Sequence, residues 1–180
     1  MPDVKYCFPS GLFDDPVSDS DWSCVVVRPR WEKKFSRWLV VRRMPHFLPL
    51  YNRRTVSGRK VRWSEIPLFP SYVFVHGIHH RPQFADTDCV VRVLCPQCDA
   101  ARLRLSSDIR GIHALLASGA DIEPVQEWVP GQRVCVKAGP LAGTVGEFIR
   151  RGANGQLIIW VNMLGVGAAV NLPPEVPVEP

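Results

Sequence analysis

The spacing of glycines differs between the two parts of this chain and limits the folds that each part can adopt. After Trp128, glycines interrupt short apolar runs at close, even spacing. The runs read RVCVKA, TVGEFI, QLIIWVN and AAVNL. Short strands with glycine at each corner are typical of a small β barrel. We therefore predict an SH3-like β-barrel domain over residues 127–180 and a different architecture before it.

The preceding part of the chain alternates strand and helix patterns. The run WSCVVVR from Trp22 is apolar and β-branched, which predicts a buried strand. Residues 30–43 carry aromatic and leucine side chains at helical spacing, and Pro45 ends the pattern. Further strands are predicted at 47–53, 67–75 and 90–94, and a second helix at 106–118 with Ser106 or Ser107 as its cap. This order predicts an α+β sandwich over residues 21–118.

Three short segments complete the predicted organisation. Residues 119–126 contain glycine and proline and are predicted to be a linker. Ser57-Gly58 is a good turn pair, and it predicts the tip of a basic hairpin. Residues 1–20 are rich in proline and aspartate, so we expect a flexible acidic tail. The fold class is therefore α+β: an α/β sandwich, a linker and a small barrel.

Positive charge is concentrated in one third of the chain. The formal net charge is only +5, yet residues 28–62 hold twelve Lys or Arg and a single acid, Glu32. Residues 126–180 carry four charges of each sign. A basic cluster favours phosphate backbones or acidic protein surfaces. A solvated helix face is the alternative interpretation of the charge alone.

The sequence contains no motif of a known enzyme class and no span long and apolar enough for a membrane. We therefore expect a cytoplasmic, monomeric, non-enzymatic protein without a cofactor. The spacing of Cys95 and Cys98 resembles half of a zinc site, but a second cysteine pair is missing. Their role stays open between a Cys-Pro turn and a zinc-dependent module that His79 and His80 would complete.

The order of these motifs resembles the NusG family. The carrying residues are LPLYNRRTVSGRKVRWSEIPLFPSYVFV, followed by the glycine-rich VPGQRVCVKAGPLAGTVG. The first part looks like the family's NGN domain and the second like its KOW domain, and the resemblance covers residues 22–175. The hairpin followed by EIPLFPSYVFV is closest to specialised RfaH-like paralogues. The resemblance implies a transcription elongation and antitermination factor, serving particular operons, that binds RNA polymerase and suppresses pausing or termination.

The resemblance also implies partners for each surface. An apolar patch would dock on the clamp helices of the polymerase β′ subunit, and Asp86, Thr87 and Asp88 lie near the implied β-subunit contact. The implied docking residues are Trp22, Phe69, Pro70, Tyr72 and Phe74. The residues implied to face upstream or non-template DNA are Arg30, Lys33, Lys34, Arg37, Arg53, Arg54, Arg59 and Lys60.

The KOW domain of the family contacts a small-subunit ribosomal protein or the termination factor Rho. Carried over to this chain, that surface includes Leu141, Gly146 and Leu164. Leu164-Gly165-Val166 replaces the family's aromatic-Gly-Arg sequence, which argues against Rho. Because QLIIWVN is β-branched and glycines recur, we expect a stable barrel rather than a switch to helices. The alternative function is a ribosome- or RNA-binding KOW protein without polymerase activity, but the neutral charge of residues 126–180 disfavours it.

Overall fold

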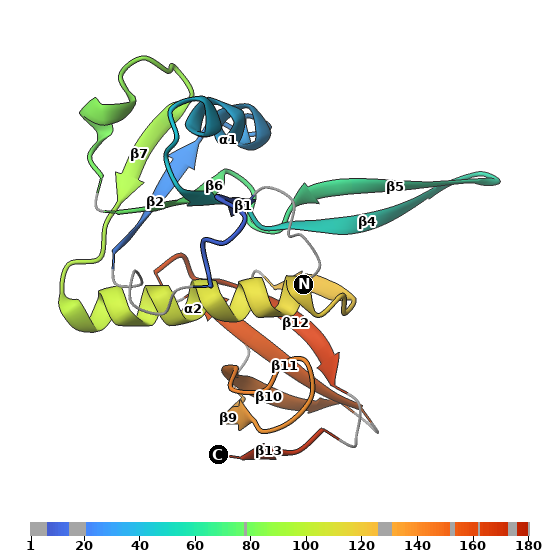
Figure 1. The fold of residues 1–180 in the computed structure, drawn as a ribbon. Helices are drawn as coiled ribbons and strands as arrows, with labels where there is room; N and C mark the ends of the chain where they lie inside the picture. The colour runs from blue at the N-terminus through green and yellow to red at the C-terminus, as the bar shows by residue number, and fades with distance from the viewer. Residues whose placement is uncertain are drawn as a thin grey trace. The chain divides into compact units, whose positions relative to one another are not determined.

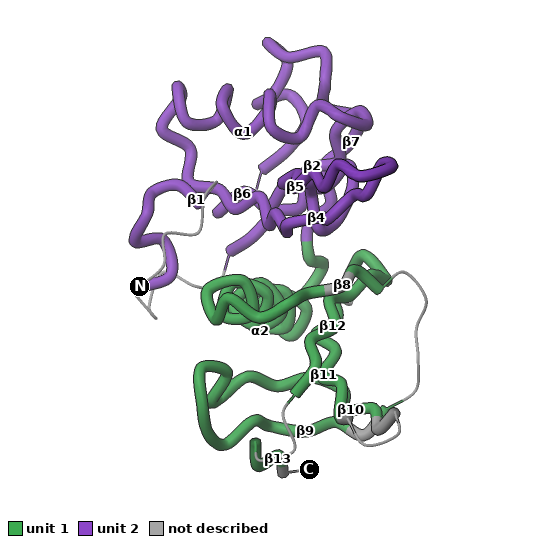
Figure 2. Tube along the Cα trace, turned by 90° about the vertical axis from the view of Figure 1, so that its right-hand side faces the viewer, with its two compact units in different colours: residues 1–4, 16–20, 96–180 green, residues 5–15, 21–95 purple. Residues whose placement is uncertain are grey.

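The computed structural model describes residues 7–14, 21–77, 79–125, 131–151, 154–161, 163–172 and 176–179. These residues form two compact units (Figure 2). The N-terminal unit contains residues 7–14 and the described part of 21–95, and the C-terminal unit contains the described part of 96–180. The division therefore falls between Cys95 and Pro96, whereas the sequence predicted a domain boundary at residue 118.

An antiparallel five-stranded sheet forms the N-terminal unit, with strand order β1-β3-β6-β2-β7. Its strands are β1 (Cys7–Phe8), β2 (Trp22–Val27), β3 (His46–Phe47), β6 (Tyr72–His76) and β7 (Val90–Leu94). The two strands predicted from WSCVVVR and VVRVL are confirmed as β2 and β7. β2 lies between β6 and β7, and its alternation places Val25 and Val27 on one face.

Helix α1 (Glu32–Val41) packs on that valine face, as the helical spacing predicted. Phe35 and Leu39 of α1 join Val73 and Val75 of β6 in one buried cluster. The helix stops because Arg43 adopts a left-handed φ of 55°, and Pro45 follows. The Met44 N–H then donates to the Leu39 carbonyl at 3.0 Å, which satisfies a helix-end acceptor.

Strands β4 (Leu50–Ser57) and β5 (Lys60–Pro67) form a separate two-stranded sheet. Figure 1 shows this hairpin extending beyond the five-stranded sheet. The predicted tip is confirmed: Ser57 pairs with Lys60, and Gly58 takes a φ of 58° that suits a residue without Cβ. The short 3-10 helix η1 (Arg81–Phe84) lies between β6 and β7 in the sequence.

The C-terminal unit holds helix α2 (Asp99–Ala117) and a six-stranded antiparallel sheet of order β13-β9-β10-β11-β12-β8. The strands are β8 (Ile122–Val125), β9 (Gln132–Val136), β10 (Val145–Arg151), β11 (Asn154–Val161), β12 (Val166–Leu172) and β13 (Val178–Glu179). α2 approaches β11 closely at Gly111, where a Cβ would meet the Ile159 side chain at 3.1 Å.

The mixed α+β class is confirmed, the SH3-like barrel is not confirmed, and the predicted start of the second helix is wrong. Within the described residues the six-stranded sheet stays open, because β13 and β8 do not pair with each other. Part of the predicted linker at 119–126 is strand β8, paired with β12. α2 begins at Asp99, so the predicted cap Ser106 is a buried residue inside the helix. Of the predicted tail, residues 7–14 are packed, and the other residues of 1–20 lie outside the described residues.

Candidate functional site

The β4–β5 hairpin has two different exposed faces. Every residue from Asn52 to Ser64 is exposed. The strand register places Arg54 opposite Trp63, and Val56 opposite Val61, on one face. On the other face the cross-strand pairs are Arg53 with Ser64, Thr55 with Arg62 and Ser57 with Lys60. One face is therefore aromatic and aliphatic with a single arginine, and the other is basic and polar.

Trp63 is a candidate functional residue that the sequence analysis did not single out. Its side chain is 66% exposed, and its neighbours Val56 and Val61 are 56% and 47% exposed. Exposed aromatic side chains beside cationic ones can stack on unpaired nucleic-acid bases. The alternation of RTV and VRW across the predicted hairpin could have revealed it, because both runs put their apolar residues on one face.

Helix α1 and its approach carry the rest of the predicted basic surface. Arg30, Lys34 and Arg37 are exposed, and the Lys34 ammonium lies 3.9 Å from the centroid of the Trp31 ring. Lys33 differs from them: its ammonium donates to the Glu65 carbonyl of β5 at 2.7 Å and so ties the helix to the base of the hairpin. The helix and hairpin therefore belong to one basic surface, in which Lys33 has a structural contact.

The five predicted docking residues have very different exposures. Pro70 is exposed and Tyr72 is half-buried. Trp22 and Phe69 are each 1% exposed, and Phe74 is 0% exposed. Ring contacts link the buried members, since Phe69 meets Phe74 edge-to-face at 6.2 Å between ring centroids. Only Pro70 and Tyr72 therefore offer side-chain surface in this structure.

Residue Ser71 lies between those two and is held in an unusual conformation. Its φ is 70°, a left-handed value that costs energy for a residue with a Cβ. The Ser71 N–H donates to Glu32 Oε1 at 2.7 Å, and Glu32 is only 4% exposed. The buried carboxylate at the start of α1 therefore fixes the turn that presents Pro70 and Tyr72.

The three residues implied for the KOW partner surface all lie in the C-terminal unit. Leu141 is 5% exposed, and Leu164 is half-buried in the turn before β12. Gly146 offers no side chain, and a Cβ there would lie 2.6 Å from the Ile158 carbonyl oxygen of β11. The close approach of β10 to β11 explains the glycine without any partner.

The cysteine pair does not build a metal centre within the described residues. Cys95 Sγ lies 3.1 Å from the His79 carbonyl oxygen, and exposed Cys98 immediately precedes α2. No group of three or more histidine, cysteine or acidic side chains is arranged for a metal in that part of the chain. The helices described here are also too short or too polar to cross a membrane.

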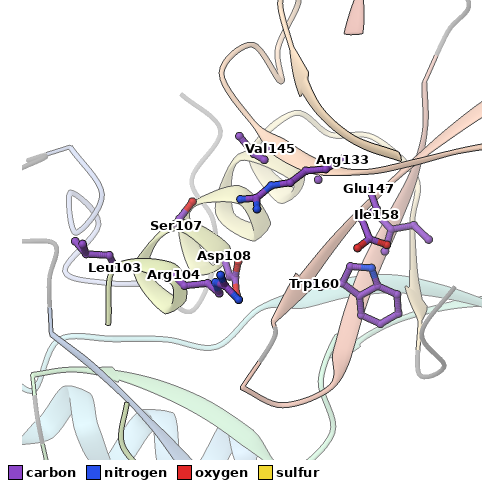
Figure 3. Close-up of a pocket in the computed structure, with 10 residues that line it drawn as sticks. Leu103, Arg104, Ser107, Asp108, Arg133, Val145, Glu147, Ile158 and Trp160 are labelled. Atoms are coloured by element: carbon purple, nitrogen blue, oxygen red, sulfur yellow. The ribbon is translucent and has the colours of Figure 1, made fainter. Parts of the chain in front are cut away.

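A cavity of about 330 Å³ lies in the C-terminal unit between α2 and strands β9, β10 and β11 (Figure 3). Arg104 and Asp108 line it from α2, and Arg133, Glu147 and Trp160 line it from the sheet. Buried Trp160 Nε1 and Glu147 Oε2 have no hydrogen-bond partner among the described residues. Both signs of charge occur on the walls, so the cavity suits water or a neutral polar molecule better than a phosphate.

The exposed hairpin and helix define a surface suited to polyanions. Comparison with protein families identifies the lineage: the chain belongs to the NusG family, whose model, described as transcription termination factor nusG, matches residues 20–128. Membership places it among transcription elongation and termination factors, which are not enzymes. The matched range includes α2 and β8 and so crosses the division between the two compact units. No curated protein sequence matches the chain.

Proposed function

We propose that this protein binds bacterial RNA polymerase during elongation and suppresses pausing or termination at particular operons, as RfaH-like factors do. The observation that carries the proposal is the family match over residues 20–128, which contains the whole candidate surface of the N-terminal unit. The protein would act by binding alone. Higher affinity for the active elongation complex than for the paused one shifts the population toward the active state.

The polymerase contact of this proposal is the surface around the turn before β6. Pro70 and Tyr72 supply its accessible side chains, whereas Trp22, Phe69 and Phe74 are buried. Aromatic side chains with a rigid backbone make strong anchors in protein interfaces. The clamp helices of β′ are the proposed partner, with the β subunit near Asp86, Thr87 and Asp88.

Nucleic acid is the proposed partner of the basic surface. Arg53, Arg54, Arg59 and Lys60 are exposed along the hairpin, and Arg30, Lys34 and Arg37 are exposed at α1. Exposed Trp63 favours a single strand over a duplex, because only unpaired bases offer a face for stacking. The non-template strand of the transcription bubble has this chemistry.

We propose that the C-terminal unit contacts the small ribosomal subunit or Rho around Leu141, Gly146 and Leu164.

Capture of purified core RNA polymerase by the immobilised full-length protein tests the polymerase contact. The informative variant is Tyr72→Ala, because Tyr72 is half-buried and its loss leaves the core intact. Phe74→Ala is unsuitable, since truncating a fully buried phenylalanine costs about 3–5 kcal/mol of stability. Tyr51→Ala is the matched control: this tyrosine is also half-buried but lies in β4, at the base of the hairpin.

The proposal expects capture by the wild type and by Tyr51→Ala, and a loss of about tenfold or more in Tyr72→Ala. Circular dichroism would establish that each variant is folded. A folded wild type that captures no polymerase, with no competing NusG in the preparation, contradicts the proposed function. Equal capture by both tyrosine variants would show that Tyr72 is not part of the polymerase contact.

A further inference from the structure

The segment Cys7–Asp14 packs on the N-terminal unit although it lies outside the range that the family model matches. Its first two residues form β1, the edge strand of the five-stranded sheet, which pairs antiparallel with β3. A turn follows, in which the Leu12 N–H donates to the Pro9 carbonyl at 3.0 Å. Leu12 is 9% exposed, so the turn is anchored by an apolar side chain as well as by the strand pairing.

Phe13 of this segment covers aromatic residues of the proposed docking surface. Its ring stacks on Trp22, with ring centroids 5.7 Å apart and planes 11° apart. The same ring meets Phe47 edge-to-face at 5.3 Å, and Phe47 stacks on Phe74 at 6.4 Å. Of the proposed docking set, Phe13 therefore contacts Trp22 directly and is linked to Phe74 through Phe47.

The anchorage of the segment is short. β1 contributes two residues to the sheet, and Phe13 itself is only half-buried. Segments with short ladders and few buried side chains open at low free-energy cost compared with the core of a domain. The segment can therefore leave the sheet without unfolding the α1 core, which lies on the opposite face of β2 and β6.

We propose that residues 7–14 form a strap that covers the Trp22 end of the polymerase-docking surface and is displaced when polymerase binds. The inference rests on the proposed function, because the masked surface is the one assigned to polymerase. If the strap covers the site in most molecules, the apparent affinity for polymerase equals the intrinsic affinity multiplied by the fraction of molecules in which the site is uncovered. A modification or ligand that holds the strap away would restore the intrinsic affinity.

Binding of core RNA polymerase to full-length Phe13→Ala tests the strap. Loss of the ring contacts with Trp22 and Phe47 should raise the open fraction, so the variant should bind about tenfold more tightly than the wild type. Val41→Ala is the control for general loss of apolar surface, since Val41 is 80% exposed at the end of α1. Phe13→Leu serves as a second variant if Phe13→Ala does not fold, and a smaller gain in affinity is expected from it.

Thiol labelling of Cys7, quantified for the individual peptide by mass spectrometry, reports the strap directly. Cys7 lies in β1 and is half-buried, and half-buried Cys135 in β9 is the internal reference. Labelling of Cys7 relative to Cys135 should accelerate in Phe13→Ala and when polymerase is added to the wild type. Cys7 labelling that is unchanged or slowed by polymerase contradicts displacement.

The two hypotheses fail in different ways. If the wild type binds polymerase and folded Phe13→Ala binds equally or more weakly, the strap is wrong while the docking surface stands. If neither protein binds although Cys7 labels faster in Phe13→Ala, the proposed docking fails, and the strap's role in masking it fails as well. Tighter binding together with faster Cys7 labelling supports both.

Discussion

Two buried polar residues explain much of the local structure around the aromatic cluster. Glu32 accepts the Ser71 N–H, and His46 bridges α1 and β3. The His46 Nδ1 donates to the Met44 carbonyl at 2.9 Å, because a carbonyl oxygen can only accept. Burial lowers the pKa of His46 and so favours the neutral imidazole, in which Nε2 accepts from the Ser36 hydroxyl at 2.6 Å. The His46 side chain is 0% exposed.

Stability should therefore fall in mild acid because of His46. Burial lowers the pKa of His46 below its ordinary value of 6.5, against a smaller raising effect of its hydrogen bond to Met44. The unfolded chain binds the proton more readily, so the stabilisation is complete above about pH 6.5 and is lost as pH falls through the folded pKa. Urea unfolding between pH 7.5 and pH 5 should show this decline, with a shallower decline in His46→Gln. Equal slopes in the two proteins would contradict the assignment.

Glu32→Ala should destabilise the N-terminal unit by about 1–3 kcal/mol, because the Ser71 N–H loses its buried acceptor. Glu32→Gln retains an amide oxygen and should cost less. Ser71→Gly should be neutral or stabilising, since glycine adopts a positive φ without penalty. Denaturant unfolding followed by circular dichroism measures all three. Identical losses in Glu32→Ala and Glu32→Gln would show that the accepting oxygen is not what matters.

At the scale of elements, the β4–β5 hairpin has one aromatic and aliphatic face and one basic and polar face, and we expect the two faces to contribute differently to nucleic-acid binding. Trp63→Ala should weaken binding of a single-stranded DNA oligonucleotide by about 1–3 kcal/mol through loss of base stacking. Binding of duplex DNA, which depends on the arginines, should change much less. Fluorescence anisotropy with labelled oligonucleotides measures both, and Trp63→Phe should retain part of the affinity. Equal losses for single strand and duplex would exclude stacking.

Local patterns were sufficient to predict some elements. The β-branched run of β2, the amphipathic spacing of α1 and the turn pair at Ser57-Gly58 each follow from residues close in sequence. β1 pairs with β3 and β8 pairs with β12, and the strands of each pair are far apart in the sequence. The local sequences of residues 7–8 and 122–125 contain no pattern that predicts these pairings. Gly119, Ala120 and Pro124 instead favoured a linker.

The exposures of the docking residues could not be read from the sequence either. PLFPSYVFV places aromatic residues on both faces of a strand, which left open which of them would face solvent. Trp22 stacks on Phe13 and Phe74 stacks on Phe47, and both partners come from other parts of the chain. The start of α2 at Asp99 was missed because the preceding Cys-Pro sequence resembled a turn and the charged residues Arg102 and Arg104 diluted the apolar spacing.

At the scale of the whole molecule, basic charge is concentrated in one part of the sequence. Twelve of the 22 basic residues lie between Arg28 and Arg62. DNA affinity should therefore decline steeply with salt, and Arg62→Ala should reduce the logarithmic salt slope by roughly 0.7–0.9 if it contacts one phosphate. Arg133→Ala, an exposed arginine of β9, is the matched control and should leave the slope unchanged. A salt titration of oligonucleotide binding measures both slopes. Equal changes of slope in Arg62→Ala and Arg133→Ala would indicate that residues of both units contact DNA.

The length of the β4–β5 hairpin sets how far its tip reaches from the five-stranded sheet. Its strands pair only with each other, so residues can be added to both arms near Gly58 without disturbing the five-stranded sheet. Each residue adds about 3.3 Å of reach per strand, and steps of two keep every side chain on its original face. The distance between the proposed docking turn at Ser71 and the nucleic-acid strand proposed to bind the hairpin can thus be changed in increments of about 7 Å. A protein built this way can acquire a new target spacing while its core remains the same.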